Sequence, residues 1–417
     1  MRRFTVPLFV ALLSLPSCEG GARTEPSVSR DSAGIRIIES RAPLWRAGSA
    51  WRLDPVPALS IGSVEGEEAY LLARVAGVDR LSDGGIVVAN GGSDDVRVFD
   101  ARGRHRFTIG RRGEGPGEFT WIRALWVLPG DSILVASSGG GRFTLFDASG
   151  GLAATRQGPP FIDPLGRFSD GSFLMARYAN PDGATEPGIH RDSLLYAVYR
   201  ARSIDAAAEA RELVSSFGPQ TLVNWPVDTL AIVAGGARYR ALRGPGMVQE
   251  AVPFTADTRT AVAGVEVFMG DGTTFQVDVH ARAGGLSRRI RLLEPNPVVT
   301  DSDVAAWQAM RRSWARTDDQ RAWAERVIAE MPFPRVKPAY SGLMVDTGGN
   351  LWVERFALDR EIPSRWAVFD PDGRYLGDVE TPARFIMRGI GEDWIIGVWW
   401  NEEDVEFVRV YRLHRSV

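Results

Sequence analysis

The sequence predicts an all-β fold, a β-propeller whose blades are four-stranded antiparallel sheets. The first observation behind this prediction is a phrase that recurs at residues 98–103, 145–150 and 368–373, where an apolar strand end runs into Asp-x-x-Gly. Asp accepts a hydrogen bond from the backbone two residues further on and Gly tolerates a positive φ, so each phrase predicts a tight turn. One turn repeated in strand-rich sequence indicates blades that bury one another's faces.

The second observation is a count of the blades. A turn rich in Gly and Asp, followed by a strongly apolar strand, recurs along the chain and predicts six blades. The apolar strands cover residues 86–89, 133–136, 173–176, 265–268, 351–353 and 394–398. The interval from Gly171 to Gly264 is longer than one blade of about 40–45 residues. It holds a loop insertion, which the Gly and Pro content of residues 219–253 favours, or a seventh blade.

The two ends of the chain predict how the ring closes. The last blade ends after strands at residues 395–400 and 405–414 and lacks a fourth strand. Residues 51–61 are strand-like and precede the first complete blade. We expect them to pair with the last blade, because this pairing covers an exposed sheet edge and joins the termini.

One segment, at about residues 300–331, breaks the β pattern. Its apolar residues recur at helical spacing, and Thr300-x-x-Asp303 and Thr317-x-x-Gln320 are candidate helix caps. We expect a helical hairpin inserted between the fourth and fifth blades. Its tryptophans either pack it onto the ring as a lid or help to form a binding surface over the central channel.

The N-terminal residues 1–17 predict an export signal. Arg2 and Arg3 precede an apolar stretch, residues 4–15, that is too short to span a bilayer as a helix. Leu15-Pro16-Ser17-Cys18 resembles the lipobox of bacterial lipoproteins, which implies lipidation of Cys18. This residue is the only cysteine. The alternative is an incidental cysteine in a cleaved secretory signal.

The predicted lipid at Cys18 makes a membrane the first expected partner. The chain then lies in the cell envelope, anchored to a bacterial membrane and facing the periplasm or the outside. Residues 18–34 carry no apolar pattern and predict a flexible tether. Residues 35–417 form the predicted propeller domain. A net charge of -3 gives no electrostatic reason to bind nucleic acid, so we expect no such partner.

A resemblance to known families rests on residues 98–119, which include Gly-Pro-Gly-Glu-Phe at 115–119. This run resembles the blade-to-blade signature of NHL-type repeats and of bacterial six-bladed β-propeller lipoproteins. There it carries the chain from the outer strand of one blade to the inner strand of the next. The resemblance implies the fold but not the function, because the wider group includes protein-binding scaffolds, lactone hydrolases and peptide-processing lyases. A phosphate-cradling loop would need a following helix, and a strand follows here.

The residues that could carry chemistry are few. The four histidines are scattered, there is no Gly-x-Ser-x-Gly motif, and no catalytic residue can be assigned. We expect no cofactor, except that the similar architecture of gluconolactonases implies a single divalent cation held in the channel by Glu, Asn and Asp. Asp79, Asn90 and Glu354 are the candidates for that metal site.

The function that we predict is a membrane-anchored extracytoplasmic binding module for an unknown protein, glycan or small-molecule ligand. The alternative is a metal-dependent lactone or ester hydrolase with its site in the central channel. Arginines near the inner strands are candidates for an anionic ligand, although they fall in different registers when aligned on the turns. They are Arg74, Arg80, Arg123, Arg167 and Arg388.

Overall fold

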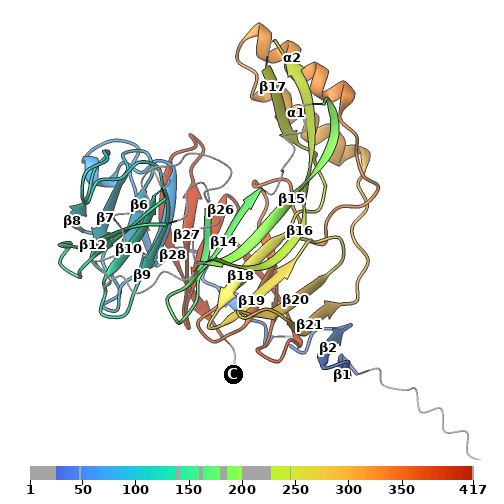
Figure 1. Cartoon of the computed structure of the whole chain (residues 1–417), viewed down its shortest axis with the longest axis horizontal. Coiled ribbons are helices and arrows are strands. Elements are labelled where there is room, and N and C mark those ends of the chain that lie inside the picture. Colours follow the sequence, from blue (N-terminus) through green and yellow to red (C-terminus); the bar gives the residue numbers. More distant parts are fainter. Residues whose placement is uncertain are drawn as a thin grey trace, which may run out of the picture.

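Six sheets surround one axis in the computed structural model of the chain (Figure 1). The structure describes residues 25–46, 48–137, 141–158, 163–178, 186–199, 227–244 and 246–415. Each sheet is a blade, numbered in chain order, and successive strands within a blade pair antiparallel. Blade 1 is β5 (Val75–Arg80), β6 (Ile86–Asn90), β7 (Asp95–Phe99) and β8 (His105–Ile109), and blade 2 is β9 (Ile122–Val127), β10 (Ile133–Ser137), β11 (Arg142–Phe146) and β12 (Leu152–Gln157).

The remaining blades follow the same order, from the inner strand to the outer strand. Blade 3 is β13 (Asp163–Arg167), β14 (Phe173–Tyr178), β15 (Gly188–Tyr199), β16 (Val227–Arg243) and β17 (Gly246–Ala251). Blade 4 is β18 (Arg259–Ala263), β19 (Glu266–Gly270), β20 (Gln276–Ala281) and β21 (Leu286–Leu292). Blade 5 is β22 (Tyr340–Val345), β23 (Leu351–Arg355), β24 (Ser364–Phe369) and β25 (Tyr375–Thr381), and blade 6 contains β26 (Phe385–Ile390), β27 (Trp394–Trp400) and β28 (Glu406–His414).

The six apolar strands predicted from the sequence are the second strands of these blades, so the blade count is confirmed. Every residue of β6 and of β10 is buried, because each second strand is covered by a neighbouring blade on both faces. One apolar cluster joins blades 1 and 2 and includes Val87, Val96, Val135 and Phe146. The ring is therefore stabilised by hydrophobic interfaces between blades.

The segment that crosses from blade 1 to blade 2 is the predicted Gly-Pro loop. Phe119 at its end is fully buried and meets the ring of Phe146 edge-on, with 5.8 Å between the ring centroids. Arg142 on β11 donates to the carbonyl oxygens of Glu114 and Gly115 at 2.9 and 3.0 Å. The guanidinium thus satisfies loop carbonyls that do not pair with a strand. These hydrogen bonds stabilise the conformation in which the loop crosses from blade 1 to blade 2.

Two short N-terminal strands complete blade 6 as predicted. These strands, β3 (Arg52–Leu53) and β4 (Leu59–Ile61), both pair antiparallel with β28. The segment before them is held by an aromatic stack, in which Trp51 lies 5.2 Å from Trp45 and 5.9 Å from Trp352 between ring centroids. Blade 6 therefore combines strands from both ends of the chain. This pairing covers the edge of β28 and closes the ring.

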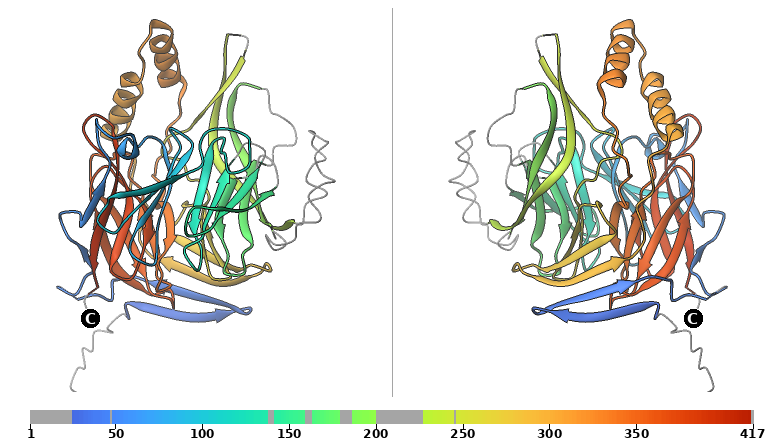
Figure 2. Two further views of the ribbon diagram at one scale, coloured as in Figure 1. Left: turned by 90° about the vertical axis from the view of Figure 1, so that its left-hand side faces the viewer. Right: turned by 90° about the vertical axis from the view of Figure 1, so that its right-hand side faces the viewer.

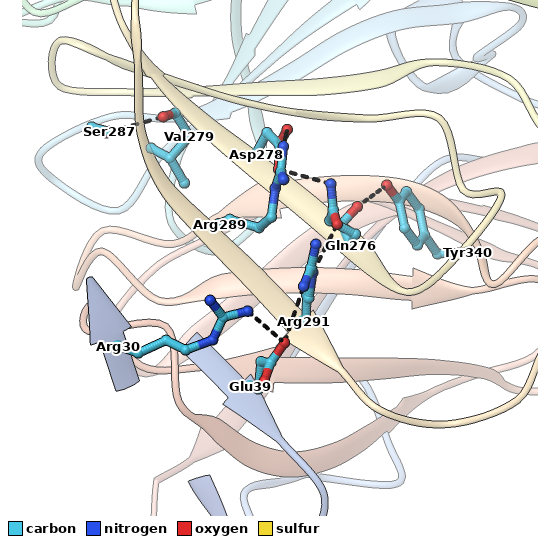
Figure 3. Close-up of polar contacts among 9 residues, drawn as sticks. All are labelled: Arg30, Glu39, Gln276, Asp278, Val279, Ser287, Arg289, Arg291 and Tyr340. Carbon is cyan, nitrogen blue, oxygen red and sulfur yellow. Dashed lines mark hydrogen bonds and ion pairs between the residues drawn. The ribbon is translucent and has the colours of Figure 1, made fainter. Parts of the chain in front are cut away.

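The N-terminal segment differs in part from the predicted tether over residues 18–34. Residues within it form β1 (Ser27–Ser32), which pairs with β2 (Ile35–Ser40), and β2 runs parallel to β21 on the outer edge of blade 4. A row of polar contacts crosses this addition (Figure 3). Along the row, Glu39 accepts from Arg291 at 3.0 Å and lies 3.7 Å from Arg30, Arg291 donates to Gln276 at 2.8 Å, and Gln276 donates to Asp278 at 3.1 Å. Sequence periodicity missed β1 because its side chains are mostly exposed and polar.

The long interval in the sequence is an extension of blade 3, and the described residues form no seventh blade. Strands β15 and β16 have 12 and 17 residues, and β16 pairs with β17 beyond the end of β14. The predicted helical hairpin is also confirmed, as α1 (Asp301–Ser313) and α2 (Asp318–Glu330) between blades 4 and 5. Thr300 and Thr317 cap the two helices through reciprocal hydrogen bonds with Asp303 and Gln320.

The two insertions pack against each other rather than acting separately. Trp307 and Trp323 from the helices share an apolar cluster with Tyr239, Ala241 and Phe254 of the blade 3 extension. We call β17, the paired half of β16 and the two helices the projecting module. Figure 2 shows it at one end of the molecule, with β1, β2 and the C-terminus at the opposite end. The helices are therefore a wall of this module and not a lid laid flat on the ring.

The ring has two ends that differ in what they carry. We call the end where the inner strands begin the mouth, and the end where they finish the base. The inner strands are β5, β9, β13, β18, β22 and β26. Because strands alternate in direction, both insertions leave the ring at the mouth, the first after β14 and the second after β21.

The predicted export signal and Cys18 lie outside the described residues. Within the part of the chain that the structure describes, no helix has the length and apolar character needed to cross a membrane.

Candidate functional site

The mouth of the ring gathers exposed arginines from several blades. They come from the inner strands, from the residue before β5 and from the loop after β23. They are Arg74, Arg123, Arg259, Arg360 and Arg388. Three of the five arginines predicted from the sequence are thus in or near the mouth, although they arise far apart in the chain.

Arg388 is the most unusual of these groups. It is the extra residue of a β-bulge in β26, between the paired positions Met387 and Gly389. The side chain is exposed, yet desolvation lowers its pKa, with Glu406 raising it and Arg360 lowering it further. The guanidinium is thus exposed to water while neighbouring protein atoms, Glu406 and Arg360 act on its charge. Since Glu406 begins β28 at the mouth, the side chain reaches from mid-strand toward that end.

The carboxylate nearest to these arginines in blade 5 is Glu354. It is half-buried at the end of β23, and desolvation raises its pKa against hydrogen bonds from Ser341 and Ser364 and the charges of Arg259 and Arg360. The bond from Ser341 to Oε2 measures 3.2 Å. The raised pKa shows that burial outweighs the hydrogen bonds and the two arginine charges that favour the ionised form.

Strained backbone marks the same end of three neighbouring blades. Arg74, Trp121 and Arg384 each precede an inner strand and have positive φ angles of 51°, 54° and 56°. Such angles are uncommon for residues with large side chains. The carbonyl oxygens of Arg74 and Arg384 accept from Gly91 and Trp400 at the ends of the adjoining strands. The same positive-φ backbone conformation therefore holds a large side chain at the mouth in each of blades 6, 1 and 2.

A carboxylate from the preceding blade also helps to fix the start of two of these inner strands. Glu406 of blade 6 accepts from the backbone N–H of Val75, the first residue of β5, at 2.7 Å. In the same way Asp94 of blade 1 accepts from the N–H of Ile122 at 3.3 Å and pairs with Arg112 at 2.9 Å. Both carboxylates thus have structural partners, which limits how much positive charge they can offset at the mouth.

The other two predicted arginines lie at the base. Arg80 and Arg167 are the last residues of β5 and β13, and each stands opposite the first residue of its second strand. These two share one register, so the prediction that all five arginines fall in different registers is wrong for this pair. Arg80 lies 5.1 Å above the ring of Trp394, and burial lowers the pKa of Arg167. The sequence itself carries this signal, because Arg80 and Arg167 each lie three residues before the turn aspartate, Asp83 or Asp170.

The three predicted metal ligands are not brought together. Asp79 lies near the base, where it accepts from the N–H groups of Val127 and Arg80, and desolvation raises its pKa. Asn90 is buried, with its oxygen accepting from Ala73 and its nitrogen donating to Ser93. Glu354 lies at the mouth end of blade 5, where Ser341 donates to it. Among the described residues, no group of three or more His, Cys, Asp or Glu side chains is placed to hold a metal ion.

Sequence reasoning missed Arg259, Arg360, Arg384 and Glu406. Arg384 could have been found, because it precedes Phe385 as Arg74 precedes Val75, had the blades been aligned on the inner strands instead of the turns. Arg360 could not, since it comes from a loop whose position depends on the fold around it.

Comparison with known proteins agrees with this architecture. Residues 63–162 match a family model described as a 6-bladed beta-propeller. The matched stretch contains all of blades 1 and 2 and the segment that crosses between them. The chain is a six-bladed β-propeller. No curated protein matches the chain.

The chain is similar to several solved structures at low sequence identity. A member of the duf4221 family from Bacteroides vulgatus is 11% identical, with a TM-score of 0.51, and the match covers 88% of this chain and 99% of that chain. A protein from Bacteroides fragilis that is predicted to be exported is 12% identical, with a TM-score of 0.48 and coverage of 91% and 100%. Virginiamycin B lyase from Staphylococcus aureus is 7% identical, with a TM-score of 0.39 and coverage of 87% and 99%. The similarity to the Bacteroides vulgatus structure supports the fold alone.

Proposed function

We propose that this propeller is an extracytoplasmic binding module that receives an anionic ligand at the mouth of the ring. Arg388 carries the proposal. Its guanidinium is desolvated, the neighbouring Arg360 repels it, and Glu406 opposes these effects while also accepting from Val75. An anion placed between Arg388 and Arg360 would replace their repulsion with attraction.

The other mouth arginines extend the surface on which such a ligand would lie. Arg74 and Arg123 are exposed in blades 1 and 2, next to blade 6 in the closed ring. Arg259 pairs with Asp257 at 3.6 Å, a long contact between partly exposed groups that water weakens. Charged side chains that converge on a ring mouth also steer an oppositely charged ligand toward it.

The sequence supports a membrane location on the opposite side. If Cys18 carries a lipid, as its lipobox implies, the chain from Cys18 to Ser27 can span about 30 Å at full extension. Strand β1 lies at the end of the molecule away from the projecting module (Figure 2). The mouth would then face away from the membrane, where a ligand can reach it.

Titration calorimetry of the purified protein with citrate and with inorganic phosphate tests the ligand class. We expect salt-sensitive citrate binding that Arg388→Gln weakens by about tenfold or more, since hydrogen bonds to charged groups contribute about 1.5–3 kcal/mol. Arg80→Gln at the base is the matched control and should leave binding unchanged. Absence of binding of either anion would refute the proposal, and so would equal losses in the two variants at unchanged thermal stability.

Membrane fractionation tests the anchor separately. The native chain should sediment with membranes and be released by detergent, whereas Cys18→Ser should move to the soluble extracytoplasmic fraction. Unchanged membrane association of Cys18→Ser would show that the chain is held by something other than a lipid on this residue.

The metal-dependent hydrolase stays an untested prediction. No observation at the mouth favours it over binding, because the three candidate ligands lie apart. Elemental analysis of the dialysed protein is the direct measurement of whether a divalent cation is retained.

A further inference from the structure

A cleft of about 300 Å³ lies in the projecting module, between the helices and the β16–β17 hairpin. Its volume is at the lower end of the range for small-molecule sites, about 300–1,000 Å³. None of the mouth arginines contributes to it. The lining residues are Arg243, Glu250, Arg311, Trp314, Ala315, Gln320, Trp323 and Ala324.

The cleft offers an aromatic surface that the fold itself leaves uncovered. Trp314 ends α1 and is 60% exposed, whereas Trp307 and Trp323 on the same pair of helices are buried in the core of the module. An indole combines a flat apolar face with a polar N–H edge. Trp314 is thus free to stack against the apolar face of a ligand without loss of a core contact.

Hydrogen-bonding groups surround this indole. Glu250 is half-buried, and Arg311 and the indole N–H of Trp323, the latter at 2.8 Å, both donate to its Oε1. Its Oε2 can therefore accept from a ligand. Arg311 holds a buried Nε without a hydrogen-bond partner. Gln320 uses its oxygen in the helix cap, which leaves the two amide N–H groups as donors.

The charges in the cleft are already balanced, unlike those at the mouth. Arg311 pairs with Glu250, and Arg243 pairs with Asp319 while lying 5.5 Å above the ring of Trp323. An anion would have to compete with these carboxylates for the arginines, and a cation would have to compete with the arginines for the carboxylates. The cleft therefore favours a ligand that is neutral, polar and flat on one face.

We propose that the projecting module binds a neutral saccharide, with one sugar ring stacked on Trp314. A pyranose ring presents C–H groups on its faces and hydroxyls around its edge, and each hydroxyl both donates and accepts. Glu250 Oε2 accepts from the hydroxyls, and Gln320 and Arg311 donate to them. The volume of the cleft suits one or two sugar units. This site is independent of the anionic ligand proposed for the mouth.

Titration calorimetry of the purified protein with a panel of neutral oligosaccharides tests the inference. The panel contains cello-, malto- and chito-oligosaccharides, with galacturonate oligomers as the charged counterparts. At least one neutral series should bind, and Trp314→Ala should weaken that binding by about tenfold, as truncation of an aromatic contact residue commonly does. The loss should appear without a change in thermal stability, because Trp314 lies at the surface.

Two further variants sharpen the result. Leu242→Ala removes another exposed apolar side chain of the same hairpin, 51% exposed and outside the cleft lining, and should leave binding unchanged. Glu250→Gln should weaken binding of the same sugars, and Arg388→Gln at the mouth should not. The inference is overturned if no neutral oligosaccharide binds, if Leu242→Ala and Trp314→Ala act alike, or if only the galacturonate oligomers bind and Arg388→Gln abolishes that binding.

Discussion

The base and the mouth of the ring are built from the same strands but use charge in opposite ways. At the base, Asp83, Asp100 and Asp147 sit in turns, and hydrogen bonds, chiefly from Gly85, Arg104 and Ser149, lower their pKa values. At the mouth, desolvation raises the pKa of Glu354 and lowers that of Arg388. The turn carboxylates at the base stabilise their own backbone, whereas Glu354 and Arg388 at the mouth are desolvated, as Asp79 and Arg167 are on the inner strands near the base. The turns at the base therefore support the fold, and the mouth is the end that we propose binds a ligand.

The largest expected effect is at the base, in Asp346. Its side chain is fully buried and accepts from Gly348, Asn350, the indole of Trp352 at 3.0 Å and Arg415 at 2.8 Å. Asp346→Ala should lower the free energy of unfolding by about 3–5 kcal/mol, because it leaves several buried donors and the partly buried guanidinium of Arg415 without their acceptor. Chemical denaturation measures this loss. Arg388→Gln, at the mouth, should cost far less, and equal losses would contradict the division between the two ends.

The pH dependence of stability should have opposite signs at the two ends. The folded-state pKa of Glu354 is raised above the ordinary value of 4.5, so its contribution is complete below that pH and is lost as the pH rises through the folded-state pKa. Glu354→Gln should therefore raise the melting temperature at pH 7, on the order of 1–2 °C, and change it little at pH 4.

Asp147 provides the matching change at the base. Its pKa is lowered from 3.8, so its contribution is present above that value and is lost as the pH falls through the folded-state pKa. Asp147→Asn should lower the melting temperature at pH 7 and have less effect below pH 3.8. Thermal melts of both variants across this range check the signs, and two shifts in the same direction at pH 7 would refute the contrast.

The smallest expected effects concern the projecting module, whose helices begin at capped threonines. Thr300→Ala and Thr317→Ala should each destabilise their helix by about 1 kcal/mol, since each removes an N-cap oxygen. Hydrogen exchange should show faster opening of α1 or α2 with the blades unaffected. Ser313→Ala is the control, because its hydroxyl bonds only to the carbonyl of Met310 in the same helix. Opening of the whole ring in the cap variants would mean that the module is not a separate unit.

Acid should also favour local opening of the helices of the projecting module, at the start of α1. Burial alone would raise the pKa of Asp303, but hydrogen bonds from Lys337 and Thr300 lower it to about 2. The ion pair of Asp303 with Lys337, at 2.7 Å, is therefore retained until the pH falls from 3.8 toward 2. Lys337→Met should move the onset of helix opening to higher pH in the same exchange experiment, and an unchanged onset would show that this pair does not hold the module.

The sequence by itself determined the ring. Local patterns sufficed for the second strands, the Asp-x-x-Gly turns and the helical caps, because each depends on residues close together in the chain. The pairing of β3 and β4 with β28 joins the two ends of the chain and was predicted from the strand that blade 6 lacked. Strand β1 escaped notice, since a mostly exposed polar strand has no apolar alternation to reveal it. The long interval in blade 3 could be recognised as irregular from the sequence. That it packs against helices α1 and α2 could not be recognised.

Only the tertiary structure decided which charged groups meet. Bulges in the inner strands place Arg388 in mid-strand and Arg123 nearer the mouth, whereas Arg80 and Arg167 share the base. Asp79 and Asn90 looked like metal ligands in the sequence and are occupied by backbone and side-chain partners in the fold. Glu250 and Trp314 face one cleft only because two insertions from different blades pack together. The physical reason is that turns and strands follow from neighbours in the chain, whereas a binding site depends on register and packing between distant segments.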